Sequence, residues 1–114
     1  MKVSELQGAM LDYFVAKAEG LEPRIGENGQ CYTFYGKYSP STDWSQGGVI
    51  ISREHICLLY EDYKSFWSAH ESDESFKKGG RDFINMIIMY DIDPLIAAMR
   101  CLVASKFGEE VPDE

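Results

Sequence analysis

The stretch Asp93-Pro94-Leu95-Ile96-Ala97-Ala98-Met99-Arg100-Cys101-Leu102-Val103-Ala104-Ser105-Lys106-Phe107-Gly108 decides the fold. Asp93 is typical of a helix N-cap, Pro94 of the first helical position, and Gly108 of the residue that follows a helix. The residues between these ends are mostly apolar, with Arg100 in the middle of the run. A helix that is apolar over most of its circumference needs cover on more than one side, so we expect the chain to pack around residues 94–107.

A second helix is predicted over residues 4–19. Ser4 and Gln7 have the spacing of a capping box, and apolar side chains then recur at intervals of three and four residues until Gly20. The apolar side of this helix is the expected partner of the C-terminal helix.

Short runs of aromatic and β-branched residues between the two helices predict strands. They cover residues 31–35, 56–60 and 65–69, with 61–64 as a hairpin connection. Residues 83–90 fit either a strand or a helical face, and we favour the strand. Because helices occur at both ends and strands between them, we predict an α+β fold with the two terminal helices packed together on a small, mostly antiparallel sheet.

The remaining segments are read from their composition. We expect an irregular passage over residues 36–48, one or two helical turns over 49–54 that close at His55, a mobile loop over 70–81 and a frayed acidic tail over 109–114. No segment is long enough to divide the chain, so we predict a single domain over residues 1–114.

The charge of the chain limits its partners. Among 114 residues, 11 are Lys or Arg and 19 are Asp or Glu, which gives a net charge of −8. Direct nucleic-acid binding is not expected, because it needs clustered basic residues. Three cysteines in no paired spacing favour reduced thiols, and no apolar run has the length of a membrane span. We therefore expect a soluble cytosolic protein with no membrane association.

Three stretches together resemble a known family. They are residues 1–6 with 11–20, the block Tyr38-Ser39-Pro40-Ser41-Thr42-Asp43-Trp44-Ser45-Gln46-Gly47-Gly48, and the run from Asp93 to Val111. In this order they are similar to the NinX-like family of small phage and prophage proteins. The resemblance implies a phage or prophage origin and assigns no activity. This chain departs from the family pattern at Val49, where proline is common, and in a longer connection over residues 70–92.

The best candidate site combines the block Ser41-Thr42-Asp43-Trp44 with Arg100. Hydroxyls, a carboxylate and an aromatic ring on a loop suit a polar ligand, and Arg100 could bind an anion beside them. The structural interpretation is favoured: Ser41 or Thr42 caps a short turn and Trp44 fills the core. On this interpretation Asp43 pairs with Arg100 and fastens the loop to the helix.

Other chemistry finds little support in the sequence. His55 and His70 have no Cys or Asp at metal-ligand spacing, and Cys57 and Cys101 have no identifiable base, so no metal, cofactor or catalytic residue is predicted.

Two classes of function remain. The first is a phage accessory protein that binds a host or phage protein through an acidic or aromatic surface. Its contact residues, if exposed, would be Tyr32, Tyr35, Tyr38, Tyr60 and Tyr63. The second is a small-molecule binder or minor enzyme with a pocket around Asp43, Trp44 and Arg100. We favour the first, and the sequence leaves open whether the chain forms a homodimer.

Overall fold

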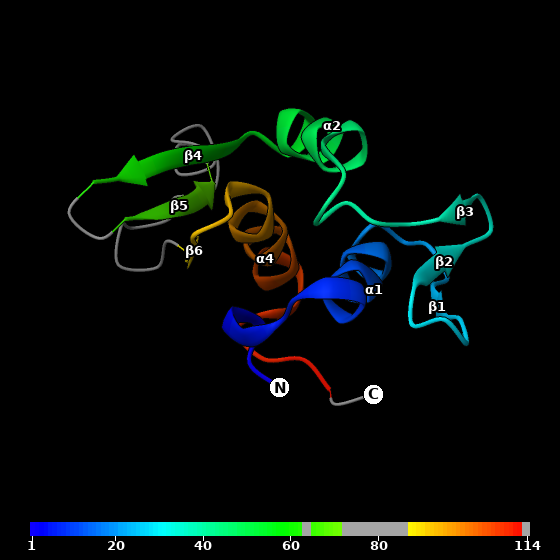
Figure 1. Cartoon of the computed structure of the whole chain (residues 1–114). Helices are drawn as coiled ribbons and strands as arrows, with labels where there is room; N and C mark the ends of the chain where they lie inside the picture. The colour runs from blue at the N-terminus through cyan, green and yellow to red at the C-terminus, as the bar shows by residue number, and fades with distance from the viewer. Residues whose placement is uncertain (63–64, 72–86, 113–114) are drawn as a thin grey trace.

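The C-terminal helix lies at the centre of the molecule. The computed structural model describes residues 1–62, 65–71 and 87–112, and in it α4 (Pro94–Phe107) has the predicted bounds. The Asp93 carboxylate accepts hydrogen bonds from the backbone amides of Leu95 and Ile96, and Gly108 follows with φ +89°. Figure 1 shows α4 between α1 (Gly8–Ala18) and a sheet. Nine residues of α4 are buried, Leu95 and residues 97–104, as the apolar composition of the helix requires.

The described residues form two three-stranded antiparallel sheets, of which the smaller packs on α1 and the larger on α4. The first contains β1 (Arg24–Ile25), β2 (Cys31–Thr33) and β3 (Gly36–Lys37), and the second contains β4 (Ile56–Glu61), β5 (Phe66–Glu71) and β6 (Ile88–Asp91). In each sheet the strand order follows the chain order. With α1, α2 (Trp44–Glu54), α4 and a short 3-10 helix η1 (Val3–Glu5), this confirms the predicted α+β fold.

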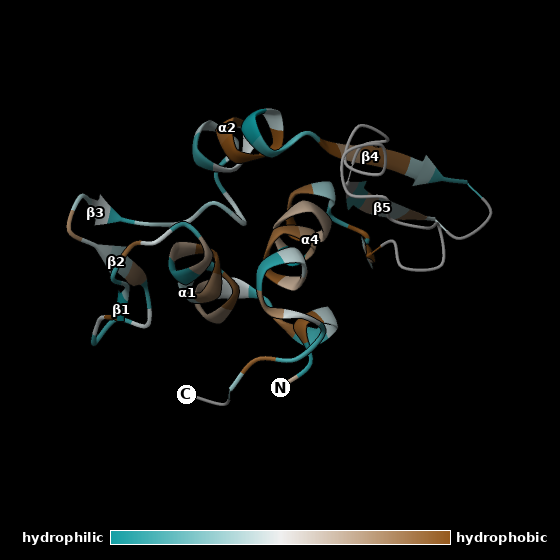
Figure 2. Cartoon of the chain, turned by 180° about the vertical axis from the view of Figure 1, so that it is seen from behind, coloured by the Kyte–Doolittle hydropathy of each residue, from teal (hydrophilic) through white to brown (hydrophobic). Residues whose placement is uncertain are grey.

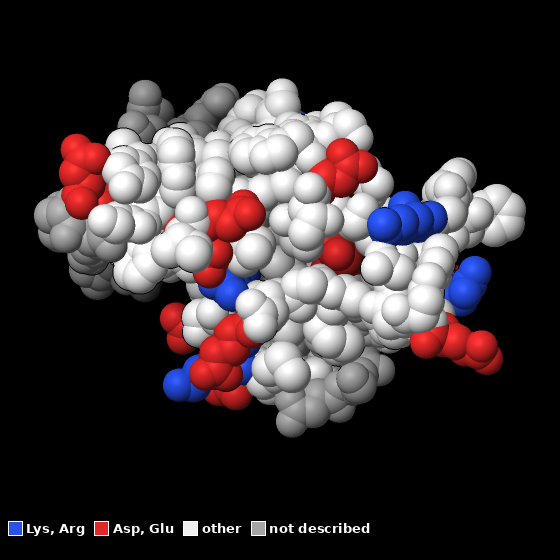
Figure 3. Space-filling view, in the orientation of Figure 1, with Lys and Arg blue, Asp and Glu red and all other residues white. Residues whose placement is uncertain are grey.

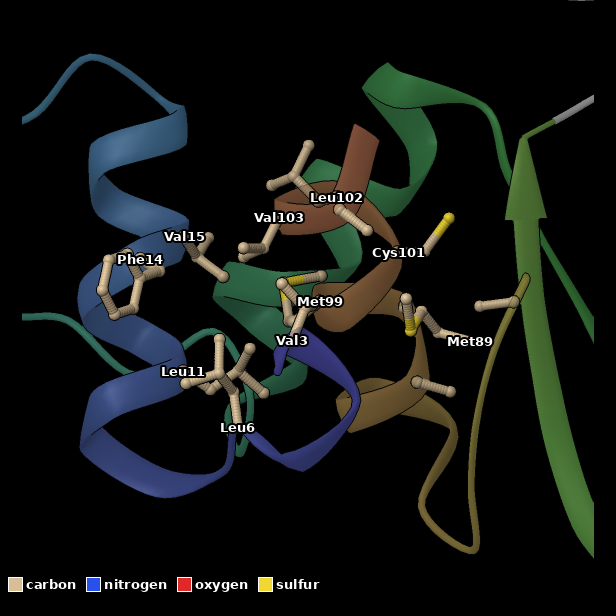
Figure 4. Packing of buried hydrophobic residues seen from close by; sticks show 14 of the residues in the cluster. Val3, Leu6, Leu11, Phe14, Val15, Met89, Met99, Cys101, Leu102 and Val103 are labelled. Carbon is tan, nitrogen blue, oxygen red and sulfur yellow. The ribbon is translucent and has the colours of Figure 1, made fainter. Parts of the chain in front are cut away.

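The face of the larger sheet that packs on α4 includes one row of small and flexible side chains. Leu58, Ala69 and Met89 lie opposite one another on β4, β5 and β6, and all three strands contact α4. In Figure 4, Leu11 and Val15 of α1 approach α4 from one side, while Met89 approaches it from the other. Figure 2 shows hydrophobic residues along much of both α4 and β4. The hydrophobic core therefore surrounds α4, the helix that was expected at its centre.

The predicted strands are confirmed in position but not in every boundary. The hairpin of β4 and β5 matches the runs 56–60 and 65–69, and β5 continues through His70 and Glu71, which were expected to start a loop. Residues 72–81 of that expected loop lie outside the described residues. Of the predicted strand 83–90, residues 88–90 belong to β6, and 83–86 lie outside the described part of the chain.

The two ends of the chain depart from their predictions. The capping box at Ser4 and Gln7 is wrong: η1 is followed by Leu6 in an extended conformation, and α1 begins only at Gly8. The acidic tail was expected to be frayed from Glu109, but it is ordered through Val111, because residues 1–3 and 109–111 pair through backbone hydrogen bonds. Burial of Val3, Leu6 and Val111 explains both differences, since this tertiary packing overrides the local capping signal.

The middle of the chain contains more regular structure than predicted. The strand expected over 31–35 ends at Thr33, and the turn after it leads into β3. Helix α2 is longer than the one or two turns expected over 49–54, because it begins at Trp44 and runs through Gly47 and Gly48. Its end at His55, with φ +56°, is as predicted. A Cβ on Gly47 would lie 2.3 Å from the Pro40 carbonyl oxygen, so α2 can lie here only with glycine at that position.

Candidate functional site

The block Ser41–Trp44 connects β3 to α2 and begins that helix. Asp43 is its N-cap: Oδ1 accepts from the Ser45 amide at 2.9 Å and the Ser45 hydroxyl at 2.7 Å, and Oδ2 accepts from Gln46 Nε2 at 3.2 Å. These hydrogen bonds hold the pKa of Asp43 below its ordinary value. Asp43, rather than Ser41 or Thr42, therefore caps the helix. The Trp44 side chain is 54% exposed, so the prediction that it fills the core is wrong.

Ser41 and Asp12 form a buried polar contact beneath this block. The Ser41 amide donates to Asp12 Oδ1 at 2.8 Å, and both residues are buried. Burial raises the pKa of the Asp12 carboxyl, while Ser41 and the charge of Lys37 partly offset that rise. Thr42, by contrast, is exposed, and its hydroxyl lies 3.5 Å from the Ser39 carbonyl oxygen. Asp12 was not among the predicted site residues, and it fastens the loop to α1.

Arg100 has different partners from the one predicted. Its Nε donates to the Leu6 carbonyl at 2.8 Å, and its Nη1 donates to the Tyr90 carbonyl and to Asp91 Oδ1, both at 3.0 Å. The residue is 6% exposed. Arg100 therefore joins α4 to β6 and to the segment before α1. The predicted pair with Asp43 is not formed.

The five predicted site residues consequently do not form one constellation. Both Asp43 oxygens are engaged by the first turn of α2, and the Arg100 guanidinium is engaged by Leu6, Tyr90 and Asp91. Both sets of contacts are structural: the first caps α2, and the second joins α4 to β6 and to the segment before α1. A binding role for the exposed residues of the block, Thr42 and Trp44, stays a prediction.

Two surface hollows lie elsewhere in the described structure. One, of about 360 Å³, is lined by Lys2, Ser4, Ile88, Met89, Tyr90, Glu109 and Glu110. The other, which we call the C-terminal hollow, has a volume of about 270 Å³ and is lined by Phe14, Lys17, Phe107, Glu110, Val111 and Pro112. Four of these six residues carry apolar side chains. No sequence pattern indicates the C-terminal hollow, because its walls come from α1, the end of α4 and the segment after it.

The turn between β2 and β3 presents two aromatic rings to solvent. Phe34 is 95% exposed and Tyr35 is 85% exposed; we call this pair the hairpin tip. Their rings pack edge to face, with centroids 5.6 Å apart. The Tyr35 amide lies 3.3 Å from the Thr33 hydroxyl, and Gly36, with φ +111°, closes the turn. The hairpin lies at the end of the molecule farthest from the larger sheet (Figure 1).

Only some of the tyrosines named as contact residues share this exposure. Tyr35 does, whereas Tyr32 and Tyr38 are half-buried. Tyr60 is exposed but packs against Trp67, with ring centroids 5.3 Å apart. Tyr63 lies outside the described residues. Phe34 was missed, because aromatic residues before a glycine look like the continuation of a strand.

Two cations accompany the hairpin tip. Arg24, Tyr32 and Lys37 lie opposite one another on β1, β2 and β3. The Arg24 guanidinium lies over the Tyr32 ring, 5.1 Å from its centroid, and the Tyr32 hydroxyl accepts from Asn28 Nδ2 at 2.8 Å. In Figure 3, basic groups lie beside the hairpin at this end of the molecule, with acidic groups below them and across much of the face shown. The three strands of the small sheet therefore contain two basic residues, Arg24 and Lys37, and no acidic residue, in a chain of net charge −8.

Comparison with known proteins identifies the family. A model described as Bacteriophage P22, NinX matches residues 2–106, so the chain belongs to this phage protein family. The resemblance that the sequence blocks indicated is confirmed. A search of curated proteins found no match.

The described residues include no helix that is both long and apolar enough to cross a membrane. They also include no group of three or more His, Cys, Asp or Glu side chains arranged to hold a metal ion.

Proposed function

We propose that this phage protein is a small interaction module that docks on another protein through its hairpin tip, in the cytoplasm of the bacterial host. The observation that carries the proposal is the exposure of Phe34 and Tyr35. Aromatic residues are enriched at protein interfaces and among the residues that dominate binding. Two adjacent rings at the end of a hairpin can both enter a pocket of a partner.

The hairpin tip is also preorganised. The hydrogen bond from the Tyr35 amide to the Thr33 hydroxyl, the edge-to-face ring pair and the strand pairing of Thr33 with Gly36 limit its conformations before binding. A rigid contact element loses less conformational entropy on association, so more of the gain from burying its rings appears as affinity. Full burial of one such ring contributes about 1.5–3 kcal/mol.

The alternative, a small-molecule pocket around Asp43, Trp44 and Arg100, has weaker support. It needed the Asp43 carboxylate and the Arg100 guanidinium to converge, and each has other partners. The two hollows described above are lined by other residues.

Photo-crosslinking in infected cells tests the proposal. A photoreactive phenylalanine analogue replaces Phe34 in one variant and Val49 in a control, since Val49 is also apolar and exposed but lies on α2. We expect a crosslinked protein, identified by mass spectrometry, from position 34 and not from position 49. The double variant Phe34→Ser, Tyr35→Ser should no longer co-purify with that protein. Equal crosslinking from both positions, or co-purification that survives the double variant, would contradict the proposal.

A further inference from the structure

We infer that the C-terminal hollow receives the hairpin tip of a second copy of this chain. The inference rests on the proposed docking role of the tip and names one partner for it. It starts from two features of the same chain that match each other: two exposed aromatic rings, and a hollow whose walls include Phe14, Phe107, Val111 and Pro112.

The sizes of the two features agree. A cavity of about 150 Å³ is large enough to bind benzene, and the C-terminal hollow measures about 270 Å³. One aromatic ring of the tip therefore fits inside, with room for part of the second. Phe107 is 45% exposed at the hollow, so an inserted ring covers apolar surface on both partners.

The charges around the two features also agree. Lys37 and Arg24 lie on the strands that carry the tip, whereas Glu110 lines the hollow and Glu109 precedes it in the chain. The remaining charged residue of the hollow, Lys17, has its ammonium 5.1 Å from the centroid of the Tyr13 ring. The approach of a cationic hairpin toward Glu110 is favourable, although two copies of charge −8 repel each other at long range.

The position of the two features sets the geometry of association. The tip belongs to the β2–β3 turn and the hollow to the ends of α1 and α4, so a contact between them is heterologous, with different surfaces on the two copies. Such contacts continue head to tail, either closing into a ring or extending as a chain. One hairpin in one hollow is a small interface, so we expect weak association.

Sedimentation analysis of the intact protein at physiological salt tests this inference. We expect the average mass to rise with concentration between about 10 μM and about 1 mM, as for a weak interface. The tip variant Phe34→Ser, Tyr35→Ser and the hollow variant Phe107→Lys should each raise the dissociation constant at least about tenfold. Lysine suits the last turn of a helix and opposes Lys37, so the hollow variant should fold. Val49→Ser is the matched control and should associate like the parent protein.

Mixing the two defective variants gives the decisive measurement. The hollow variant keeps an intact tip and the tip variant keeps an intact hollow, so an equimolar mixture should form a 1:1 dimer and nothing larger. A monomeric parent protein at about 1 mM would overturn the inference, and so would a mixture that stays monomeric. Self-association that survives in the hollow variant but not in the tip variant would indicate tip-to-tip contact and would also overturn it.

This test separates the inference from the proposed function. The hollow variant Phe107→Lys, with its tip free, also serves as bait in the crosslinking experiment. If it captures another protein while the parent chain remains monomeric, the inference fails and the proposed function stands. If the parent chain self-associates and the bait captures nothing, the inference stands, the tip keeps its docking role toward a second copy, and the proposed docking on a different protein fails.

Discussion

Replacing Arg100 with methionine removes a guanidinium that holds three segments of the chain together. Methionine retains much of the aliphatic length, so packing within α4 is largely preserved. What is lost is the set of hydrogen bonds to the Leu6 carbonyl, the Tyr90 carbonyl and Asp91. The Leu6 acceptor lies at a residue that is almost fully buried, where water cannot easily replace the donor.

The expected loss of stability follows from these contacts. A buried acceptor left without a donor costs about 1–3 kcal/mol, and hydrogen bonds to a charged group are stronger than average. Tyr90 and Asp91 are more accessible and can be partly rehydrated. We therefore expect Arg100→Met to lower the free energy of unfolding by about 2–5 kcal/mol. For a chain of this size that corresponds to a fall in Tm of about 10–20 °C.

Urea unfolding followed by circular dichroism measures this loss. Lys106→Met, on the exposed last turn of the same helix, is the matched control and should change stability little. Arg100→Lys should recover only part of the loss, because an ammonium cannot reach three acceptors in the fork geometry of arginine. A variant Arg100→Met within about 1 kcal/mol of the parent protein would refute the claim that this residue fastens β6 and the N-terminal segment to α4.

Three other predictions concern α2, Asp12 and the cysteines. Gly47→Ala should destabilise by about 1–3 kcal/mol, because its Cβ would lie 2.3 Å from the Pro40 carbonyl oxygen. Gly48→Ala, whose nearest neighbour atom would be 3.8 Å away, should stabilise α2 by about 0.5–1 kcal/mol; urea midpoints that rank the two alanine variants the other way would contradict the packing of α2. Burial raises the pKa of Asp12 from 3.8, so the folded state binds a proton more tightly than the unfolded chain, and stability is lost as pH rises from about 4 through the raised pKa. Asp12→Asn should therefore gain stability relative to the parent protein between pH 4 and pH 7, and a pH-independent difference in urea midpoint would speak against this. A thiol reagent applied to the native protein should modify Cys57 before Cys31 and Cys101, because those two are buried. Burial, together with the charge of Asp12, also raises the pKa of the Cys31 thiol to about 11. Peptide mass spectrometry that finds Cys31 modified first would contradict this order.

Helix α4 could be predicted because its signals are local. The cap at Asp93, the proline after it and the closing Gly108 lie within the run that forms the helix. Helix α2 shows the opposite case. Two adjacent glycines lower helix propensity, yet Gly47 is required by the approach of the Pro40 carbonyl in the preceding loop and of Leu95, which is distant in the sequence. Helix propensity reflects the conformational cost of glycine in a helix and contains no information about how closely Pro40 and Leu95 approach Gly47.

The predicted pairing of Asp43 with Arg100 was wrong for a related reason. An arginine among apolar neighbours needs a partner or a route to water, but choosing that partner among the acidic residues requires the topology. Asp91 ends β6, and the turn into α4 brings it back to the helix, whereas Asp43 is engaged in capping α2. Exposure of Phe34 was equally hidden, since only the register of Thr33 with Gly36 turns an aromatic run into a hairpin tip.

The placement of α4 has a consequence for biosynthesis. Every other described element precedes this helix in the chain, and the surfaces of α1, α2 and the larger sheet are buried against it. A ribosome therefore delivers those surfaces before the segment that covers them, and during that interval they are open to chaperones or to aggregation. A premature stop codon anywhere before residue 94 would leave that nascent polypeptide permanently without its centre, and a target for proteolysis.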